Sequence, residues 1–312
     1  MSVLRRVFPI LLLLLLLKFP VWSVQGAANG LLLWFNVVLP TLSPFIICTQ
    51  TIVALDGVKL MMIPVYPVLH RLFGLSVQGS YVMFCGMLCG YPLGARLCAD
   101  FKERGAITSR EADYLLAVCN HPSPMFLLGY VTGQLPFAVS PALLFTCLYL
   151  PVLPLSMIAR RVYRLEDPEK ACVLSCAQLP DAEPKPPSLE DIIHSTCETM
   201  VLIGGYIMLF SILAAWVQHL DFLPPAFRLL LIGAAEITTG VNQICAGLPA
   251  VWILPAVIAA VAFGGLSGIF QTKSVTKNAG LSIRHYVLWK LLHACLSCMI
   301  LTALQCILLL LR

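Results

Sequence analysis

The sequence predicts an all-α fold: a polytopic helical membrane protein with broken or re-entrant helices and an inverted repeat. The first observation is composition, because the 312 residues are 59% hydrophobic and only 11% charged, with a mean hydropathy of +0.90. Soluble domains carry about 25% charged residues, so this chain has too little polar surface to cover a soluble globule. Polar residues also interrupt membrane-length apolar segments, and two parts of the chain share an order of motifs.

The apolar segments are the candidate spanning helices, because a helix needs about 20 apolar residues to cross the hydrocarbon layer. They cover 7–24, 28–55, 58–74, 78–98, 111–134, 136–159, 190–218, 223–245, 249–271 and 283–311. Several contain proline or glycine, so some are expected to be re-entrant, and the number of spans stays open.

Residues 1–27 form the first predicted element, which has two interpretations. Arg5-Arg6, the apolar core Leu11–Leu17 and the small residues near Gly26 are typical of a signal peptide. The next apolar segment begins at once, which favours an uncleaved first spanning helix.

The net charge of +5 comes from short basic loops and does not indicate nucleic-acid binding. Short basic loops tend to stay in the cytoplasm, so segments 111–134 and 136–159 are predicted to form a hairpin with both ends there. By simple counting, Lys273, Lys277 and Arg284 would lie on the outer side. Either 249–271 is partly re-entrant or the count is off by one at that point.

No metal or other cofactor is expected. Most of the 13 cysteines lie in apolar segments, where cysteine usually behaves as a small hydrophobe. The pairs Cys172/Cys176 and Cys295/Cys298 lack the further ligands of a zinc site. The chain contains no G-x-x-x-x-G-K-[ST] loop, so it encodes no nucleotide-driven motor of that type.

A polar, proline-rich stretch at 165–189 is predicted to be a cytoplasmic linker between two membrane halves, 28–164 and 190–312. Each half has a helix breaker before an aromatic–aliphatic run and later a Gly-x-x-x-Gly segment, Gly86/Gly90 in the first and Gly264/Gly268 in the second. The segment count gives corresponding elements opposite directions, as in the inverted repeats of many secondary transporters. The alternative is chance, because small-x-x-x-small patterns recur in packed membrane helices.

Glu236 is the leading candidate for a site within the membrane. It follows the apolar run 229–235 and precedes Thr238 and Thr239, and an unpaired carboxylate there would be expensive. It is predicted to bind a solute or to couple a proton or cation. The alternatives are a structural pair with a basic residue such as His194, and threonine hydroxyls that bond back to their own helix.

A second polar break, at 119–124, contains the candidates Asn120 and Ser123. Pro122 and Pro124 deprive the preceding carbonyls of their helical partners. Those carbonyls and the Asn120 amide could bind a cation or a base or sugar. The alternative is a kink whose polar groups are satisfied by neighbouring helices.

Four further residues complete the predicted solute or ion site: Tyr91, Ser43, Ser267 and Gln271. Tyr91 precedes Pro92, where the alternative is a simple helix end before a cytoplasmic loop. Ser43 lies in a segment broken by prolines, where half-helix ends can face a ligand and the alternative is a tertiary kink. Ser267 and Gln271 share a helix face, although Gln271 could instead mark the membrane edge.

Several of these motifs occur together in one order: Gly90-Tyr-Pro-Leu-Gly-Ala-Arg96, Gly105-Ala-Ile-Thr-Ser-Arg-Glu-Ala112, Cys119-Asn-His-Pro-Ser-Pro124, Glu236-Ile-Thr-Thr-Gly240 and Gly264-Gly-Leu-Ser-Gly268. In this order they resemble the YlbJ-type sporulation integral membrane proteins, within the wider group that carries a nucleoside-recognition Gate domain. The resemblance covers roughly residues 28 to 300. Residues 121–124 depart from it, because a smaller, glycine-containing stretch is expected after Asn120.

The resemblance implies an all-helical, multi-pass protein of the bacterial cell membrane that is linked to sporulation and carries a small solute. A small solute or ion and the lipid bilayer are the expected partners, nucleic acid is not one, and homo-oligomerisation is left open. The protein is expected not to be an enzyme.

Two other functions remain as alternatives. One is a membrane scaffold for spore assembly that does not transport. The other is a rhomboid-like intramembrane serine protease, because Gly265-Leu-Ser-Gly268 matches the nucleophile motif G-x-S-G and His293 follows as a candidate base.

Overall fold

The computed structural model describes residues 3–165 and 187–310, and this part of the chain is helical with no strand. The all-α prediction is therefore confirmed. The predicted linker lies almost entirely outside the described residues, as do Cys172 and Cys176.

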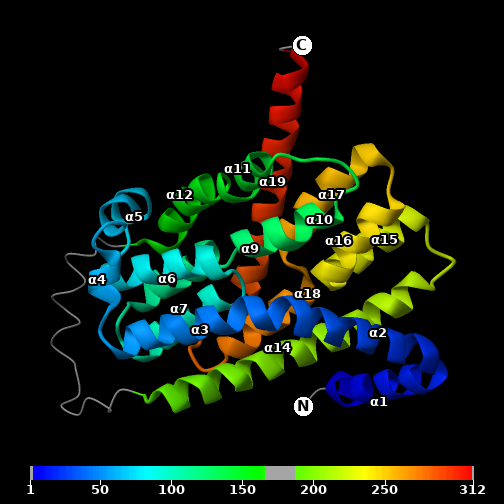
Figure 1. The fold of residues 1–312 in the computed structure, drawn as a ribbon, viewed down its shortest axis with the longest axis horizontal. Coiled ribbons are helices and arrows are strands. Elements are labelled where there is room, and N and C mark those ends of the chain that lie inside the picture. The colour runs from blue at the N-terminus through cyan, green and yellow to red at the C-terminus, as the bar shows by residue number, and fades with distance from the viewer. Residues whose placement is uncertain (1–2, 166–186, 311–312) are drawn as a thin grey trace.

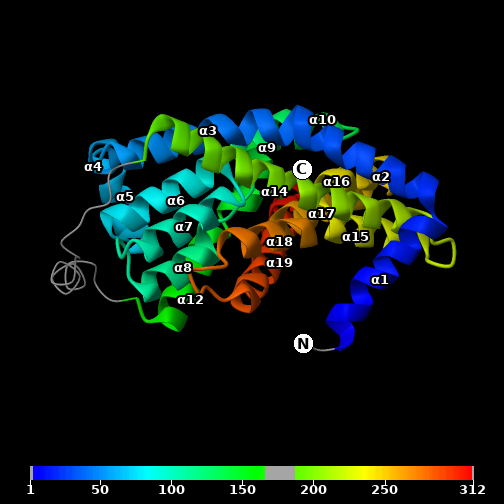
Figure 2. The same ribbon diagram turned by 90° about the horizontal axis from the view of Figure 1, so that it is seen from below.

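Two long helical rods pack side by side and run antiparallel (Figures 1 and 2). The first is continuous through α2 (Pro20–Leu33), a π-helical turn η1 (Trp34–Val38) and α3 (Leu39–Ala54), and the second is α14 (Leu189–Gln218). Trp216 Nε1 donates to Ser23 Oγ over 3.0 Å near one end, and Ser195 Oγ donates to Gln50 Oε1 over 3.1 Å near the other. A β-carbon on Gly26 would meet the α14 backbone at 2.8 Å, so only glycine permits this approach.

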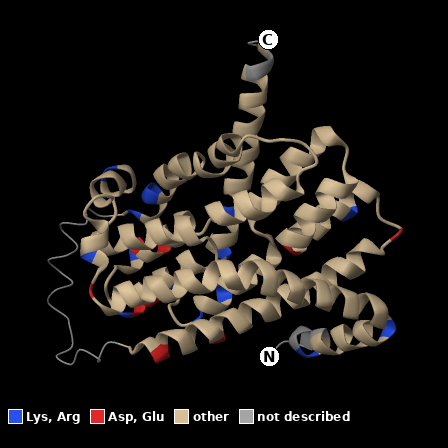
Figure 3. Ribbon diagram, in the orientation of Figure 1, with Lys and Arg blue, Asp and Glu red and all other residues tan. Residues whose placement is uncertain are grey.

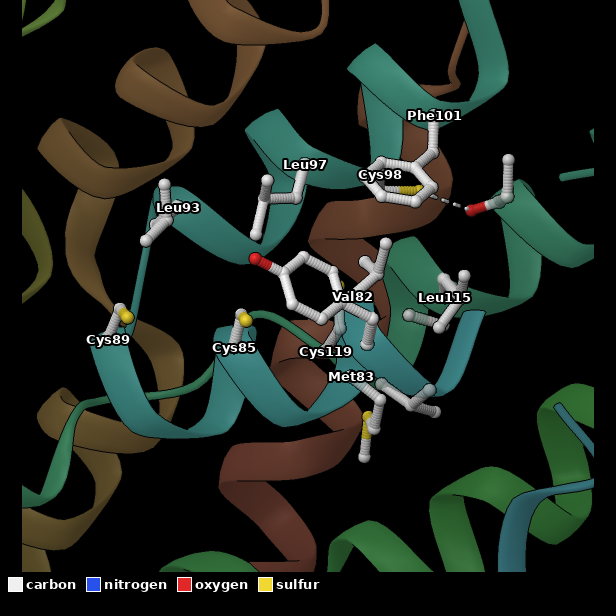
Figure 4. Close-up of a cluster of buried hydrophobic side chains, with 14 of the residues drawn as sticks. Val82, Met83, Cys85, Cys89, Leu93, Leu97, Cys98, Phe101, Leu115 and Cys119 are labelled. Carbon is white, nitrogen blue, oxygen red and sulfur yellow. Dashed lines mark hydrogen bonds between the residues drawn. The ribbon is translucent and has the colours of Figure 1, made fainter. Parts of the chain in front are cut away.

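Two helical hairpins follow the rods, one in each half of the chain. The first consists of α6 (Val77–Cys89) and α7 (Leu93–Glu103), and the second of α15 (Pro225–Ala235) and α16 (Ile237–Gly247). Glycines let the arms touch, because a β-carbon on Gly94 would lie 3.0 Å from the Cα of Gly86, and one on Gly240 would lie 2.3 Å from the Cα of Gly233. Figure 4 shows the apolar side chains of α6 and α7 packed together in the first hairpin.

Each hairpin is followed by a helix with an interruption. In the first half, α8 (Ser109–Val118) is separated by residues 119–123 from α9 (Pro124–Phe126), the π-helical η2 (Leu127–Val131) and α10 (Thr132–Gln134). In the second half, α17 (Ala250–Phe263) and α18 (Gly265–Val275) meet at Gly264, whose φ of +83° favours glycine.

The remaining helices complete the two halves. They are α1 (Val3–Lys18), α4 (Val58–Met62), α5 (Tyr66–Phe73), α11 (Pro141–Tyr149), α12 (Val152–Tyr163) and α19 (Ile283–Leu310). The C-terminal end of α19 projects from the rest of the molecule (Figure 1). Charged residues are sparse along the ribbon (Figure 3).

The order long rod, hairpin, interrupted helix and closing segment thus occurs twice, although α4 and α5 separate rod and hairpin in the first half only and α19 alone closes the second. The two rods run in opposite directions, as an inverted repeat requires. The corresponding elements are not those paired from the sequence. Gly86 and Gly90 belong to a hairpin, whereas Gly264 interrupts a continuing helix, so the counterpart of α6–α7 is α15–α16. Small-x-x-x-small spacing marks close packing only in the first place, where β-carbons on Gly86 and Gly90 would meet backbone atoms at 2.2 and 2.7 Å. Nothing lies closer than 3.7 Å to a β-carbon added to Gly264 or Gly268.

In the described part of the chain, five helices are long and apolar enough to cross a membrane. The pair α5 and α6 passes the same test only together, across a bend of 94°, as a broken span or a re-entrant loop. The longer sequence-based list is wrong at two segments, 78–98 and 223–245, because each folds back on itself as a hairpin. It is also wrong at the N-terminus, where the helix break falls at Phe19 and residues 20–54 form one rod. Hydropathy measures only how long an apolar stretch is. It does not show whether the chain crosses the membrane or turns back within it.

The hairpin α15–α16 also explains the basic loop that simple counting placed on the outer side. Because residues 225–247 double back, one crossing is lost and the count is off by one. Lys277 shares a cleft with Asp100 and Glu103, beside the loop predicted to be cytoplasmic. Nearby, Trp289 Nε1 donates to Tyr163 Oη over 2.8 Å, which places the basic end of α12 at the same end of the molecule.

Candidate functional site

A cavity of about 260 Å³ lies where the two hairpin tips and the two helix interruptions meet. Its wall includes Tyr91 from the first tip, Ser123 from the first interruption, Glu236 from the second tip and Gly264 from the second interruption. The rods contribute Asn36, Thr41 and Ile207, and the segment after the first interruption contributes Phe126 and Tyr130. Four backbone irregularities from distant parts of the chain therefore converge on one space.

Glu236 forms the tip of the second hairpin because its backbone is extended, with φ −144° and ψ 122°, which ends α15 and starts α16. Its side chain is 2% exposed and caps α16. One carboxylate oxygen accepts from the Thr238 N–H over 3.1 Å, and the other accepts from the Thr239 N–H over 2.7 Å and the Thr238 hydroxyl over 2.6 Å. These donors and the positive end of the α16 dipole stabilise the carboxylate without a basic partner.

The proposed structural pair between Glu236 and His194 is not found. His194 Nδ1 lies 3.6 Å from Glu198 Oε1, and both side chains are exposed. The other alternative, threonine hydroxyls that bond back to their own helix, does not hold for Thr238, whose hydroxyl donates to the Glu236 carboxylate. The Thr239 hydroxyl is buried without a hydrogen-bond partner, and Thr239 does not line the cavity, whereas Thr238 does.

Tyr91 forms the tip of the first hairpin, next to a cis peptide bond to Pro92 and after Gly90, whose φ is +84°. Its backbone N–H donates to the carbonyl of His121 over 3.0 Å, which ties the tip to the first interruption. Its phenol oxygen is buried without a hydrogen-bond partner, and the residue lines the cavity. A simple helix end before the cytoplasmic loop is therefore the wrong description, because α7 separates Tyr91 from that loop.

The carbonyls freed by Pro122 and Pro124 are satisfied by the protein, as the kink interpretation expected. The carbonyl of Val118 accepts from His121 Nε2 over 2.8 Å, and that of Asn120 accepts from Lys290 Nζ over 3.2 Å. The carbonyl of Pro122 accepts from Tyr149 Oη over 2.7 Å. These carbonyls are therefore already occupied as acceptors.

The Asn120 side chain lies outside the cavity wall. Its amide donates to Tyr286 Oη over 2.8 Å and to Thr272 Oγ1 over 3.0 Å, whereas its Oδ1 is buried without a partner. Ser43 is also outside the wall, with a buried, unpartnered hydroxyl. The structure thus separates these two predicted residues from the rest of the site.

Ser123, Ser267 and Gln271 do line the cavity. Ser123 Oγ accepts from the Phe126 N–H over 3.1 Å and caps α9, which leaves its own hydrogen available. Gln271 Nε2 donates to Ser267 Oγ over 3.0 Å. Gln271 is buried, so its side chain faces the protein interior and the cavity.

Sequence reasoning missed Lys290, which is 2% exposed inside α19. A lysine within an apolar segment was the available signal, because such residues normally face the protein interior and have a function. It also missed the wall residues Asn36, Thr41, Phe126 and Tyr130, for which the apolar patterns gave no distinguishing signal.

The geometry does not support the protease alternative. His293 Nε2 lies 2.8 Å from the carbonyl oxygen of Leu148, and His293 Nδ1 lies 3.2 Å from that of Ala262. Both ring nitrogens are therefore engaged away from Ser267, which instead accepts from Gln271.

The fold and the cavity define a class: a multi-pass, all-helical membrane protein with two re-entrant hairpin tips and two interrupted helices around a buried polar site. Within that class the sequence is similar to the sporulation integral membrane protein YlbJ of Bacillus subtilis (strain 168), at 26% identity over 308 residues. The match covers 88% of this chain and 75% of the relative, and it supports the YlbJ-type assignment that the motifs suggested. No family model matches the chain. No solved structure matches it significantly.

Proposed function

We propose that this protein binds a small, nucleoside-like solute in the cavity and carries it across the cell membrane, either passively or with an ion, during sporulation. The observation that carries the proposal is that Glu236 and Ser123, from opposite halves of the chain, line one cavity at the meeting point of four helix breaks. Solute sites of secondary transporters lie at such breaks between inverted repeats. The link to sporulation rests on the similarity to the sporulation protein YlbJ.

The size and chemistry of the cavity support a small polar molecule with a flat apolar part. Its volume of about 260 Å³ is just below the roughly 300–1,000 Å³ typical of drug-sized ligands. The rings of Phe126 and Tyr130 are stacked at 5.4 Å and leave apolar surface for a heterocycle. The Glu236 carboxylate and the free phenol of Tyr91 provide a hydrogen-bond acceptor and a donor.

The two hairpins also suggest how access would alternate. The loop end of α7 lies near Lys277. Helices α15 and α16 lie on the opposite side of the molecule (Figure 1), where Asn242 Nδ2 donates to Gln134 Oε1 over 2.7 Å. The tips therefore enter from opposite ends and meet at the cavity. Movement of either tip would open the cavity to its own side, as alternating access requires.

A thermal-shift screen of the purified protein in lipid nanodiscs tests the proposal. Nucleosides, amino acids, small carboxylates and cations would be compared on wild type, Glu236→Gln and Glu198→Gln. Glu198→Gln is the matched control, because it removes an exposed carboxylate from another helix. We expect one ligand class to stabilise wild type and Glu198→Gln, and to stabilise Glu236→Gln less.

The scaffold alternative has one observation in its favour: the three hydrogen bonds to the Glu236 carboxylate all come from its own helix turn, so a structural cap accounts for them. A scaffold predicts no stabilising ligand in the screen. It also predicts that spore formation tolerates loss of the Tyr91 hydroxyl when protein levels are unchanged.

A further inference from the structure

Arg96 ties the first hairpin to the second rod on the side of the α7 loop. Its guanidinium donates to the hydroxyl of Thr199 on α14 and, over 3.4 Å each, to the carbonyl and the hydroxyl of Ser195. Its Nε lies 3.8 Å from Oδ2 of Asp100, one turn further along α7. Ser195 Oγ also donates to Gln50 on α3. This network, the Arg96 latch, therefore joins α7 to both rods.

The latch lies beside a route out of the cavity. A second cleft, of about 370 Å³, lies on the side of the α7 loop, and Arg96 is part of its wall. On α14, Ile207 lines the cavity and Leu202 lines the cleft, and on α18 the same holds for Gln271 and Val275. Each pair is separated by little more than one helical turn. A gap between α7, α14 and α18 would therefore connect the two spaces, and the Arg96 latch holds α7 to α14 at that place.

The opposite side of the molecule has a weaker counterpart. There α16, the second arm of the second hairpin, is joined to α14 by Gln218 Nε2, which donates to Gln243 Oε1 over 3.3 Å, and to α10 by the bond between Asn242 and Gln134. Both hydrogen bonds are exposed and link neutral amides. The Arg96 side chain is charged and only 13% exposed. Hydrogen bonds of a charged group are about twice as strong as neutral ones, so the side of the α7 loop is held more firmly.

We propose that the Arg96 latch is the gate of the cavity on the side of the α7 loop, and that the protein rests with this side closed and opens first on the side of α16. The inference rests on the proposed function, because it assigns one latch to each side of an alternating-access cycle. Opening requires the guanidinium to leave Thr199 and Ser195. Asp100 lies one turn away on the same helix and moves with Arg96, so the charge keeps a partner when the gate opens.

The native thiol of Cys89 reports access to the cavity, because Cys89 lines the cavity and is 3% exposed. A small, charged, membrane-impermeant thiosulfonate would be added to right-side-out and to inverted membrane vesicles, and site-resolved mass spectrometry would follow modification of Cys89. In wild type we expect faster modification from the side of α16. In Arg96→Gln the rate from the side of the α7 loop should rise at least about tenfold, because hydrogen bonds to a charged group favour the closed state by that factor or more.

Arg104→Gln is the matched control, because it removes an exposed guanidinium from the end of the same helix. It should leave both rates at their wild-type values. Equal rates in Arg96→Gln and Arg104→Gln would contradict the gate. A rise from both sides alike in Arg96→Gln would show loosening of the whole protein and would also contradict it.

The wild-type rates alone can overturn the proposal if Arg96→Gln fails to fold. Faster modification of Cys89 from the side of the α7 loop, or no modification from either side, would contradict a resting state that opens toward α16. The measurement needs no solute. A ligand screen without a hit would therefore count against the proposed function, whereas the Cys89 rates decide the gate.

Discussion

Tyr91 and Glu236 occupy equivalent places in two hairpins from different halves of the chain, and both side chains line the same cavity. The two tips differ in how their polar groups are satisfied. The Glu236 carboxylate accepts three hydrogen bonds from its own turn, whereas the Tyr91 phenol has none. An unpaired buried hydroxyl costs about 1–3 kcal/mol, so Tyr91 is the wall group with most to gain from a ligand.

Tyr91→Phe should therefore separate ligand binding from stability. Without a ligand we expect the free energy of unfolding to stay equal or rise by about 1 kcal/mol, because an unsatisfied polar group is removed. The affinity for the solute found in the screen should fall about tenfold, the value of one neutral hydrogen bond. Thermal unfolding and ligand titration measure the two effects. Unchanged affinity would mean that the phenol does not contact the solute.

Gly240→Ala should prevent the second hairpin from closing. The new β-carbon would lie 2.3 Å from the Cα of Gly233, on rigid backbone that cannot move aside. Overpacking of this kind costs about 1–3 kcal/mol or more, so we expect a lower unfolding temperature and loss of ligand stabilisation.

Gly205→Ala is the control for that change, because nothing lies within 4 Å of its new β-carbon on α14. It should leave the protein equally stable or up to about 1 kcal/mol more stable, since alanine favours the helix. Equal effects of the two variants would contradict the close packing of α15 against α16.

The hairpin topology predicts which residues lie on the same side of the membrane. Lys102→Cys and Lys277→Cys, in a background with the exposed native cysteines replaced, should react with a membrane-impermeant maleimide from the same side of the membrane. Asn242→Cys should react from the other side, because Asn242 bonds to Gln134 at the opposite end. Labelling of positions 102 and 277 from opposite sides would mean that residues 225–247 cross the membrane.

Asp100, at the loop end of α7 outside the spanning segments, should give stability a pH dependence. Burial raises the pKa of its carboxyl above the ordinary value, although Arg96 and Arg104 oppose the shift. The folded state then holds the proton more tightly than the unfolded state. Its contribution is complete below the unfolded pKa, about 4, and is lost as pH rises through the folded pKa.

The Asp100 carboxyl should make the unfolding temperature fall between pH 4 and 7, and Asp100→Asn should remove that part of the fall. The comparison with wild type across that range is the measurement. An unchanged slope would show that the Asp100 carboxyl is not perturbed by burial. A steeper dependence of unfolding temperature on pH in Asp100→Asn would mean that folding lowers the pKa of the Asp100 carboxyl instead of raising it.

Much of the candidate site was visible in the sequence, because a polar residue inside an apolar segment is costly wherever it lies. That argument selected Glu236, and helix-breaking motifs selected Tyr91 and Ser123, all three of which line the cavity. The same reasoning selected Asn120, whose amide turned toward Tyr286 instead. Polarity marks a group that needs a partner, but it does not say which neighbour provides one.

Composition and local pattern determined that this chain is an all-helical membrane protein, because the cost of exposing apolar surface is a sum over residues and needs no knowledge of their arrangement. Tertiary structure alone decided that residues 78–98 and 223–245 turn back as hairpins, that four breaks meet at one cavity, and that Arg96 joins the first hairpin to the second rod. These outcomes depend on contacts between distant glycines and helices. Hydropathy is the same for a segment that crosses the bilayer and for one that reverses halfway.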